Sequence, residues 1–129
     1  MEPVARLIIP AEGLQFVSMN QLRTAHWTKK HKLSKQWRER TWAACAQARF
    51  PRGLEPARIV SQLMFTSNRR RDPHNYMATL KPIIDELVSW GCWPDDTAEF
   101  VRVDEPVLAV GKAQQVTLLI FPQEKTYEF

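Results

Sequence analysis

The sequence predicts an α/β fold of the α+β type, a small mixed β-sheet with two main helices packed on it, in one domain over residues 1–129. Segments with strand-like and helix-like patterns follow one another in the order β, α, β, α, β, β. The 44% hydrophobic content and five tryptophans can supply a buried core without disulfides. We therefore expect one globular domain.

The first half of the chain is predicted to form a strand, a long loop, a helix and a second strand. Residues 4–9 are apolar and β-branched, whereas residues 11–28 show no clear period. From residue 29 to 48, apolar side chains recur at helical spacing on one side: Leu33, Trp37, Ala44, Cys45 and Ala48. The other side carries Lys30, Lys35, Arg38 and Arg40. Residues 58–66 alternate as a half-buried strand does.

The best-marked element is a helix over residues 73–90. Asp72 stands where an N-cap belongs, Pro73 takes the first helical position, and Gly91 stands where a left-handed C-terminal residue is preferred. Pro82 should kink this helix or remove one of its hydrogen bonds. The remaining segments are predicted to be a turn and two strands, over residues 93–96, 98–103 and 116–121.

Two features favour a cytosolic protein without membrane contact. No apolar run approaches the ~20 residues of a membrane span, and the opening residues lack the basic start and cleavage site of a signal peptide. Cys45 and Cys92 stand in no metal-binding spacing, so both are expected to be reduced and structural.

Charge is unevenly distributed along the chain. Residues 1–71 hold 14 Lys/Arg and 4 Asp/Glu, whereas residues 72–129 hold 4 Lys/Arg and 10 Asp/Glu. The first part favours polyanions, and the second concentrates carboxylates. A simple DNA-binding module has little use for the acidic part, whereas a metal-dependent nuclease uses both. Solvated surface charge without a function is the alternative.

The stretch from Arg69 to Asn75 places three arginines directly before Asp72. Hydrolysis of a phosphodiester develops negative charge on phosphate oxygens, which a divalent cation can neutralise while it activates water. Mg²⁺ prefers oxygen ligands and usually takes one or two carboxylates, so Asp72 and the pair Asp95-Asp96 are candidate ligands. The adjacent arginines could hold phosphates through bidentate hydrogen bonds.

Each feature also has a purely structural interpretation. Asp72 before a proline is an ordinary helix cap, and Asp95-Asp96 after Pro94 is ordinary turn composition. A run of three arginines is usually a solvated loop, and His74 on a first helical turn is more often a surface residue than a ligand. The order of these residues around one helix favours the functional interpretation.

In that order the residues resemble the RusA family of Holliday junction resolvases, found widely in phages and prophages. The family pattern runs Arg-Asp-x-Asp-Asn, then a helix with a lysine and Asp-x-Leu, then a turn ending in Asp-Asp before a strand. This chain reads Arg71-Asp72-Pro73-His74-Asn75, then Asp85-Glu86-Leu87, then Asp95-Asp96. The resemblance covers roughly residues 16–121 and implies a dimeric, metal-dependent endonuclease that resolves four-way DNA junctions in recombination and repair.

The resemblance also implies roles for individual residues. Asp72 and Asp96 match two of the family's three catalytic aspartates, with Asp95 as the neighbouring acid. His74 stands in place of the second aspartate, where a neutral imidazole suits Mn²⁺ or Zn²⁺ better than Mg²⁺ or could serve as a general base. The family's helical lysine falls at Ala78, with Lys81 one turn later as a stand-in. Asp72, His74, Asp95 and Asp96 are thus the expected metal ligands, for Mg²⁺ or Mn²⁺.

The basic residues are expected to contact the DNA, so affinity should fall steeply as salt rises. Trp27 or His26 could stack into the junction centre, although packing of Trp27 in the core is an equal alternative. The expected DNA contacts are Lys29, Lys30, Lys35, Arg38, Arg69, Arg70, Arg71 and Lys81. Two other functions stay open: a non-catalytic DNA-binding protein, and a structural protein that self-associates through its charge asymmetry.

Helix length bears on how a metal site would assemble. A helix over residues 73–90 is about 27 Å long at ~1.5 Å per residue, which places Asp72 and Asp96 near opposite ends. Either the loop over residues 92–97 folds back, or two helices pair antiparallel in a two-fold dimer. We expect the dimer, with Asp72 of one chain beside Asp96 of the other. Asp85 lies too far from Asp72 to share a metal within one chain.

Overall fold

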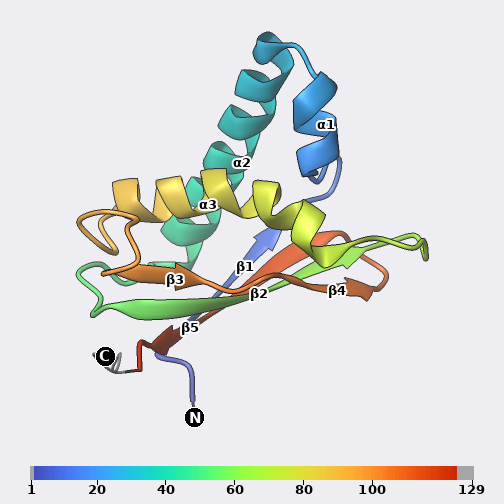
Figure 1. Ribbon diagram of the computed structural model, residues 1–129. Helices are drawn as coiled ribbons and strands as arrows, with labels where there is room; N and C mark the ends of the chain where they lie inside the picture. The colour runs from blue at the N-terminus through green and yellow to red at the C-terminus, as the bar shows by residue number, and fades with distance from the viewer. Residues whose placement is uncertain (1, 125–129) are drawn as a thin grey trace, which may run out of the picture.

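A computed structural model describes residues 2–124, which form a five-stranded mixed sheet with the helices on one face (Figure 1). In chain order the elements are β1 (Ala5–Pro10), α1 (Met19–Thr24), α2 (Trp27–Ala48), β2 (Ala57–Phe65), the 3-10 turn η1 (Pro73–Tyr76), α3 (Met77–Trp90), β3 (Val101–Val103), β4 (Val107–Val110) and β5 (Gln115–Pro122). The predicted fold class, a small mixed sheet with two main helices packed on it, is confirmed.

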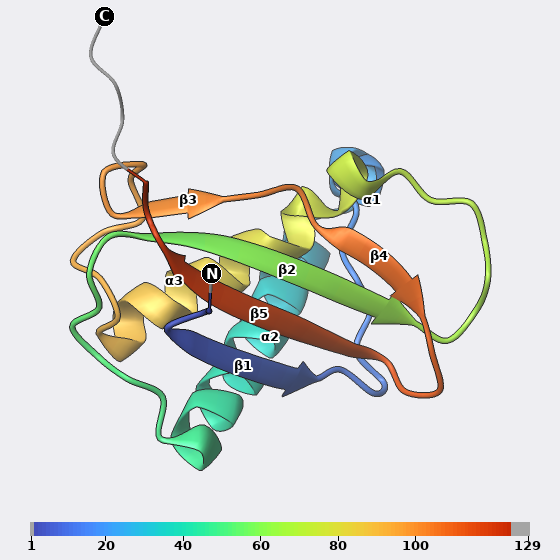
Figure 2. The ribbon, with the colours of Figure 1, turned by 90° about the horizontal axis from the view of Figure 1, so that it is seen from below.

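The central strand is β2, which has partners along both edges. It pairs antiparallel with β5 on one edge and parallel with β3 and then β4 on the other. β1 pairs antiparallel with β5, so the sheet order is β1-β5-β2-β3 with β4 further along the β3 edge. Figure 2 shows the sheet from the side that the helices leave uncovered.

The hydrophobic core lies between the sheet and the helices α2 and α3. Alternation along β2 buries Ile59, Leu63 and Phe65 on one face, as the sequence predicts, and Arg58 on the other face is exposed. Trp37 of α2 is fully buried, and its indole N–H donates to the carbonyl oxygen of Gln15 at 2.9 Å. This hydrogen bond satisfies the one polar group of a side chain that otherwise fills the core.

Cys45 and Cys92 are buried free thiols, in keeping with a structural role. Burial is the main cause that raises the pKa of the Cys45 thiol to about 11 and that of Cys92 to about 12. Because the thiolate is the reactive form of cysteine, both side chains are chemically inert near neutral pH.

The predicted helix over residues 73–90 is present but begins differently. Its first turn is the 3-10 turn η1, and the α-helix proper starts at Met77. Asp72 caps this start as predicted, and Gly91 ends α3 with a φ of 108°, in the left-handed region. Pro82 lies inside α3 and is buried.

The structure corrects the predicted N-terminal half in two places. Residues 19–24 form α1 rather than a loop, because Ser18 and Gln21 make the reciprocal hydrogen bonds of a capping box. The next helix, α2, starts at Trp27 rather than at residue 29. Ala48, which was assigned to the apolar side of that helix, is exposed at its last turn.

The predicted C-terminal half is also corrected. Residues 98–100 form a turn rather than the start of a strand, because the backbone N–H groups of Phe100 and Val101 both donate to the carbonyl of Thr97 at 2.9 Å. The strand β4 was not predicted. None of the helices within residues 2–124 is long and apolar enough to cross a membrane.

Candidate nucleic-acid interface and active site

The arginine run lies on the loop between β2 and η1, and its three residues differ in their surroundings. The Arg71 guanidinium lies 3.8 Å from the centroid of the Phe65 ring and donates to the carbonyl and hydroxyl oxygens of Ser67 at 2.9 and 2.8 Å. Its Nε is buried without a hydrogen-bond partner among the residues that the structure describes. Arg69 and Arg70 are exposed. Arg71 therefore shapes the loop, while the other two face solvent.

Asp72 follows the arginines and caps η1. Its Oδ1 accepts a hydrogen bond from the backbone N–H of His74 at 3.1 Å, and its carbonyl accepts from that of Asn75 at 3.1 Å. Asp72 and His74 are both exposed. Within residues 2–124 the second carboxylate oxygen of Asp72 makes no hydrogen bond, so it can still bind a ligand. The capping role and a metal-binding role are compatible.

Asp95 and Asp96 lie on the loop between α3 and β3, which folds back along the helix. Asp96 accepts a hydrogen bond from the Lys81 ammonium at 2.6 Å, and Lys81 also pairs with Asp85 at 3.0 Å. The Asp95 carboxylate accepts from the backbone N–H of Asp96 at 2.7 Å. The expectation that Asp96 lies near the far end of the helix is therefore wrong, since it stands beside the middle of α3.

The contact between Lys81 and Asp96 changes the acidity of both groups. The hydrogen bond from Lys81 is the largest cause that lowers the pKa of the Asp96 carboxyl. The same hydrogen bond is the largest cause that raises the pKa of the Lys81 ammonium. Both groups are charged at neutral pH. Because two carboxylates already pair with its ammonium, Lys81 is less available to DNA phosphates than the exposed Arg69 and Arg70, which make no ion pair within residues 2–124.

The four predicted metal ligands form two separate pairs. Asp72 and His74 stand at the start of η1, and Asp95 and Asp96 stand beside α3. Within residues 2–124, no group of three or more His, Cys, Asp or Glu side chains is placed to hold a metal ion. Mg²⁺ usually takes one or two carboxylates and completes its shell with water and substrate phosphates, so the donor chemistry of Asp95 and Asp96 suits it. Asp72 with the His74 imidazole suits Mn²⁺ better.

Two neighbouring surface depressions have no carboxylate in their linings. One has a volume of about 650 Å³ and is bordered by Lys29, Lys32 and Gln15. The other has a volume of about 210 Å³ and is bordered by Arg69, Arg71 and, again, Gln15. Because Gln15 borders both, they form one surface from the first turns of α2 to the arginine loop. We call Lys29, Lys32, Gln15, Arg69 and Arg71 the basic track.

The predicted basic face of α2 is divided between two sides of the helix. Lys35 and Arg38 border a different groove, which opens toward α3. There Arg38 donates to the Ser89 hydroxyl at 2.8 Å and lies 3.5 Å from the carboxylate of Glu86. Lys30 is half-buried and borders neither surface. Only part of the predicted DNA-binding set therefore belongs to the basic track.

The short helix α1 joins the N-terminal segment to the start of α3. The Thr79 hydroxyl accepts from the backbone N–H of Val17 at 2.9 Å and donates to its carbonyl at 2.7 Å. The backbone N–H of Asn20 donates to the Asn75 side chain at 3.1 Å. These contacts place α1 beside η1, the turn that Asp72 caps.

Two residues of the basic track were not predicted. Lys32 follows Lys29 by three positions, so its place on the same helical face could have been found from the sequence. Gln15 carries no such signal, because its position depends on the packing of its loop against Trp37.

Of the two roles considered for Trp27, packing in the core is wrong, since 69% of the residue is exposed.

No model of a known protein family matches the chain, and no curated protein matches it.

Proposed function

We propose that the protein is a metal-dependent endonuclease that cuts branched DNA, with four-way junctions as its substrate. The observation that carries the proposal is the basic track, whose two arginines lie on the loop that leads to Asp72, the cap of η1. A carboxylate-free surface with two lysines and two arginines suits a phosphate backbone. A phosphodiester bound to this surface would lie near the exposed carboxylate of Asp72, which directly follows Arg71 in the chain.

Asp72 is the residue best placed to hold the metal ion. It is exposed, and only one of its carboxylate oxygens is used in capping η1. His74, two residues later, supplies an imidazole nitrogen as a further ligand or as a proton acceptor. When bound, a divalent ion would polarise the phosphate and lower the pKa of a water molecule. Arg69, whose side chain is exposed, would orient the phosphate by charge-assisted hydrogen bonds.

We further propose that the protein acts as a two-fold dimer. The Asp96 carboxylate lies beside Lys81, roughly half-way along the helical segment that begins after Asp72. An antiparallel pairing of two such segments centred near Ala78 would bring Asp72 of one chain to the level of Asp96 in the other. Ala78 is small and half-buried, so it would allow the two helices to approach closely. The two resulting sites would suit the paired cuts that resolve a four-way junction.

The first test replaces Asp72 with asparagine, which keeps the side-chain shape and a capping oxygen. On a synthetic four-way junction with Mg²⁺ or Mn²⁺, Asp72→Asn should cut at least about 100-fold more slowly, because the metal loses a charged ligand. Junction affinity should be retained, since Asp72 is not a phosphate-binding residue. Asp104→Asn is the matched control, because Asp104 follows β3 and pairs with Arg58 of β2 at 2.6 Å. Unchanged cleavage by Asp72→Asn would refute the proposal.

A second function, a DNA-binding protein without catalysis, is favoured by one observation. Lys81 already neutralises Asp96 in the isolated chain, and its ammonium lies where a cation beside that carboxylate would have to sit. A protein of this kind would bind junctions through the basic track in the presence or absence of metal. Junction binding by the wild-type protein, without cleavage under any divalent metal, would support this function over the nuclease.

A further inference from the structure

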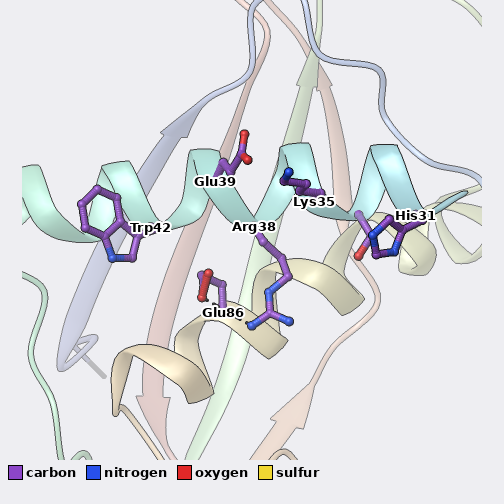
Figure 3. Close-up of a pocket in the computed structure, with 7 residues that line it drawn as sticks. His31, Lys35, Arg38, Glu39, Trp42 and Glu86 are labelled. Atoms are coloured by element: carbon purple, nitrogen blue, oxygen red, sulfur yellow. Dashed lines mark ion pairs between the residues drawn. The ribbon is translucent and has the colours of Figure 1, made fainter. Parts of the chain in front are cut away.

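A second groove runs along the other side of α2, facing α3, and has a volume of about 560 Å³ (Figure 3). This volume falls in the range of pockets that hold small organic groups, about 300–1,000 Å³. In Figure 3, Trp42 and His31 lie toward opposite ends of this groove, and Arg38 and Glu86 point toward each other. We call it the α2–α3 groove, and its labelled side chains are His31, Lys35, Arg38, Glu39, Trp42 and Glu86.

Helical spacing explains why an aromatic and a cationic side chain share this groove. Counting from Trp27, the intervals to His31, Lys35, Arg38 and Trp42 are four, four, three and four residues. Residues three or four apart are neighbours on one helical face. The face is therefore a continuous row of aromatic and basic side chains, and its tryptophans at the two ends are 69% and 55% exposed.

The charge of the α2–α3 groove differs from that of the basic track. Lys35 and Arg38 are opposed there by Glu39 and Glu86, so the lining is balanced. Glutamates in a groove repel a phosphate backbone, which makes this surface unsuited to the charged edge of a duplex. A neutral, flat ligand that offers both donors and acceptors fits it better.

Two side chains in the groove are placed to recognise such a ligand. The Glu86 side chain is only 15% exposed, and its single ion pair within residues 2–124 is the 3.5 Å contact with Arg38. Because a carboxylate can accept about four hydrogen bonds, this one can accept another from a ligand in the groove. Arg38 is held by Ser89 at 2.8 Å, which fixes its guanidinium beside Glu86. Trp42 adds an exposed aromatic face at the end of the groove.

We propose that the α2–α3 groove binds an unpaired nucleobase. The base stacks on Trp42, and its amino group donates a hydrogen bond to the Glu86 carboxylate. Nucleobases are flat, uncharged and rich in donors and acceptors, and they stack readily on tryptophan. Carboxylates accept hydrogen bonds from the amino group of cytosine. This inference rests on the proposed nucleic-acid function. It adds a binding site for single-stranded DNA apart from the basic track, of use where strands separate at a branch point.

The test compares single-stranded with duplex DNA. Fluorescence anisotropy would measure the affinity of labelled oligodeoxycytidine, oligodeoxythymidine and a duplex of equal length. Trp42→Ala should weaken oligodeoxycytidine binding about tenfold, as expected for the loss of one stacked base, and leave duplex affinity nearly unchanged. Trp42→Phe should restore much of the loss. Glu86→Gln should reduce the preference for oligodeoxycytidine over oligodeoxythymidine, which lacks an amino group.

Lys32→Ala is the matched control, because Lys32 lies on the same helix but in the basic track. It should weaken single-stranded and duplex binding equally. If the wild-type protein binds duplex and junction DNA but Trp42→Ala leaves single-strand affinity unchanged, this inference fails and the proposed function stands. If the protein binds no DNA at low salt, both fail. A change of oligomeric state in Trp42→Ala, with unchanged DNA affinity, would instead assign the groove to a protein contact and overturn the proposal.

Discussion

At the scale of single residues, Lys81 joins α3 to the loop that carries Asp95 and Asp96. The sequence suggested that Lys81 would contact DNA, but the structure places its ammonium between Asp85 and Asp96. Asp85 follows Lys81 by four residues on the same helix, whereas Asp96 comes from the loop that folds back along α3. The lysine thus holds Asp96 beside the helix, in a position from which a metal ion could displace it.

The pKa of Asp96 is the measurable consequence of this contact. Because hydrogen bonding to Lys81 lowers that pKa, the stabilising effect of the contact is present above the ordinary carboxyl value of 3.8 and is lost as pH falls through the lowered folded value. Lys81→Met should therefore raise the titration midpoint of Asp96 toward 3.8, as followed by NMR of its carboxyl carbon. Lys35→Met removes the same charge from a different surface and should leave the midpoint unchanged. An unaltered midpoint in Lys81→Met would show that Lys81 does not hold Asp96.

At the scale of elements, both main helices end in the left-handed region but with different residues. α3 ends at Gly91, whose φ is 108°, while α2 ends at Arg49, whose φ is 51°. Glycine adopts this region without steric conflict, whereas other residues strain the backbone by about 1–2 kcal/mol. The end of α3 matters for the site, because the loop with Asp95 and Asp96 starts there.

Removing the glycine that ends α3 and introducing one at the end of α2 should affect the free energy of unfolding differently. Gly91→Ala should lower the free energy of unfolding by about 1 kcal/mol, because alanine resists a positive φ and its Cβ would come within 3.3 Å of the Arg52 side chain. Arg49→Gly should leave it unchanged or raise it by a few tenths of a kcal/mol. Urea unfolding followed by circular dichroism would measure both. Equal stability of Gly91→Ala and wild type would contradict the role assigned to this cap.

At the scale of the whole molecule, two surfaces of different charge flank α2. The basic track is lined without carboxylates, and the α2–α3 groove has balanced charge. This separation suits a ligand with both a charged backbone and exposed bases. The predicted metal ligands, in contrast, form two pairs within one chain, and we propose that a site using Asp72 and Asp96 together assembles between two copies.

Mixing inactive variants would test the shared site. Asp72→Asn and Asp96→Asn should each be inactive alone. If Asp72 of one chain works with Asp96 of the other, a mixed dimer has one intact site, so an equal mixture should recover about a quarter of the wild-type sites after subunit exchange. Sedimentation would establish the dimer. No recovery in a mixture shown to exchange subunits would place each site within a single chain.

Patterns of local origin were predictable from the sequence. The alternation in β2, the cap at Asp72, the Gly91 end of α3 and the apolar side of α2 all depend on neighbouring residues. Apart from Ala48, which is exposed, they agree with the structure. The short helix α1 was missed although its capping box was visible, since six residues show too little periodicity. The strand β4 was missed because its four residues gain their strand conformation by pairing with β2.

By itself, the sequence determined the fold class, the uneven charge and the order of acidic and basic residues around one helix. Only the tertiary structure decided which of these residues meet. It placed Lys81 against Asp96, brought Gln15 between two groups of cations, and turned Arg38 and Trp42 away from the basic track. The physical reason is one of range: caps and periodicity act within a few residues, whereas these contacts depend on how loops and helices pack across the whole sheet.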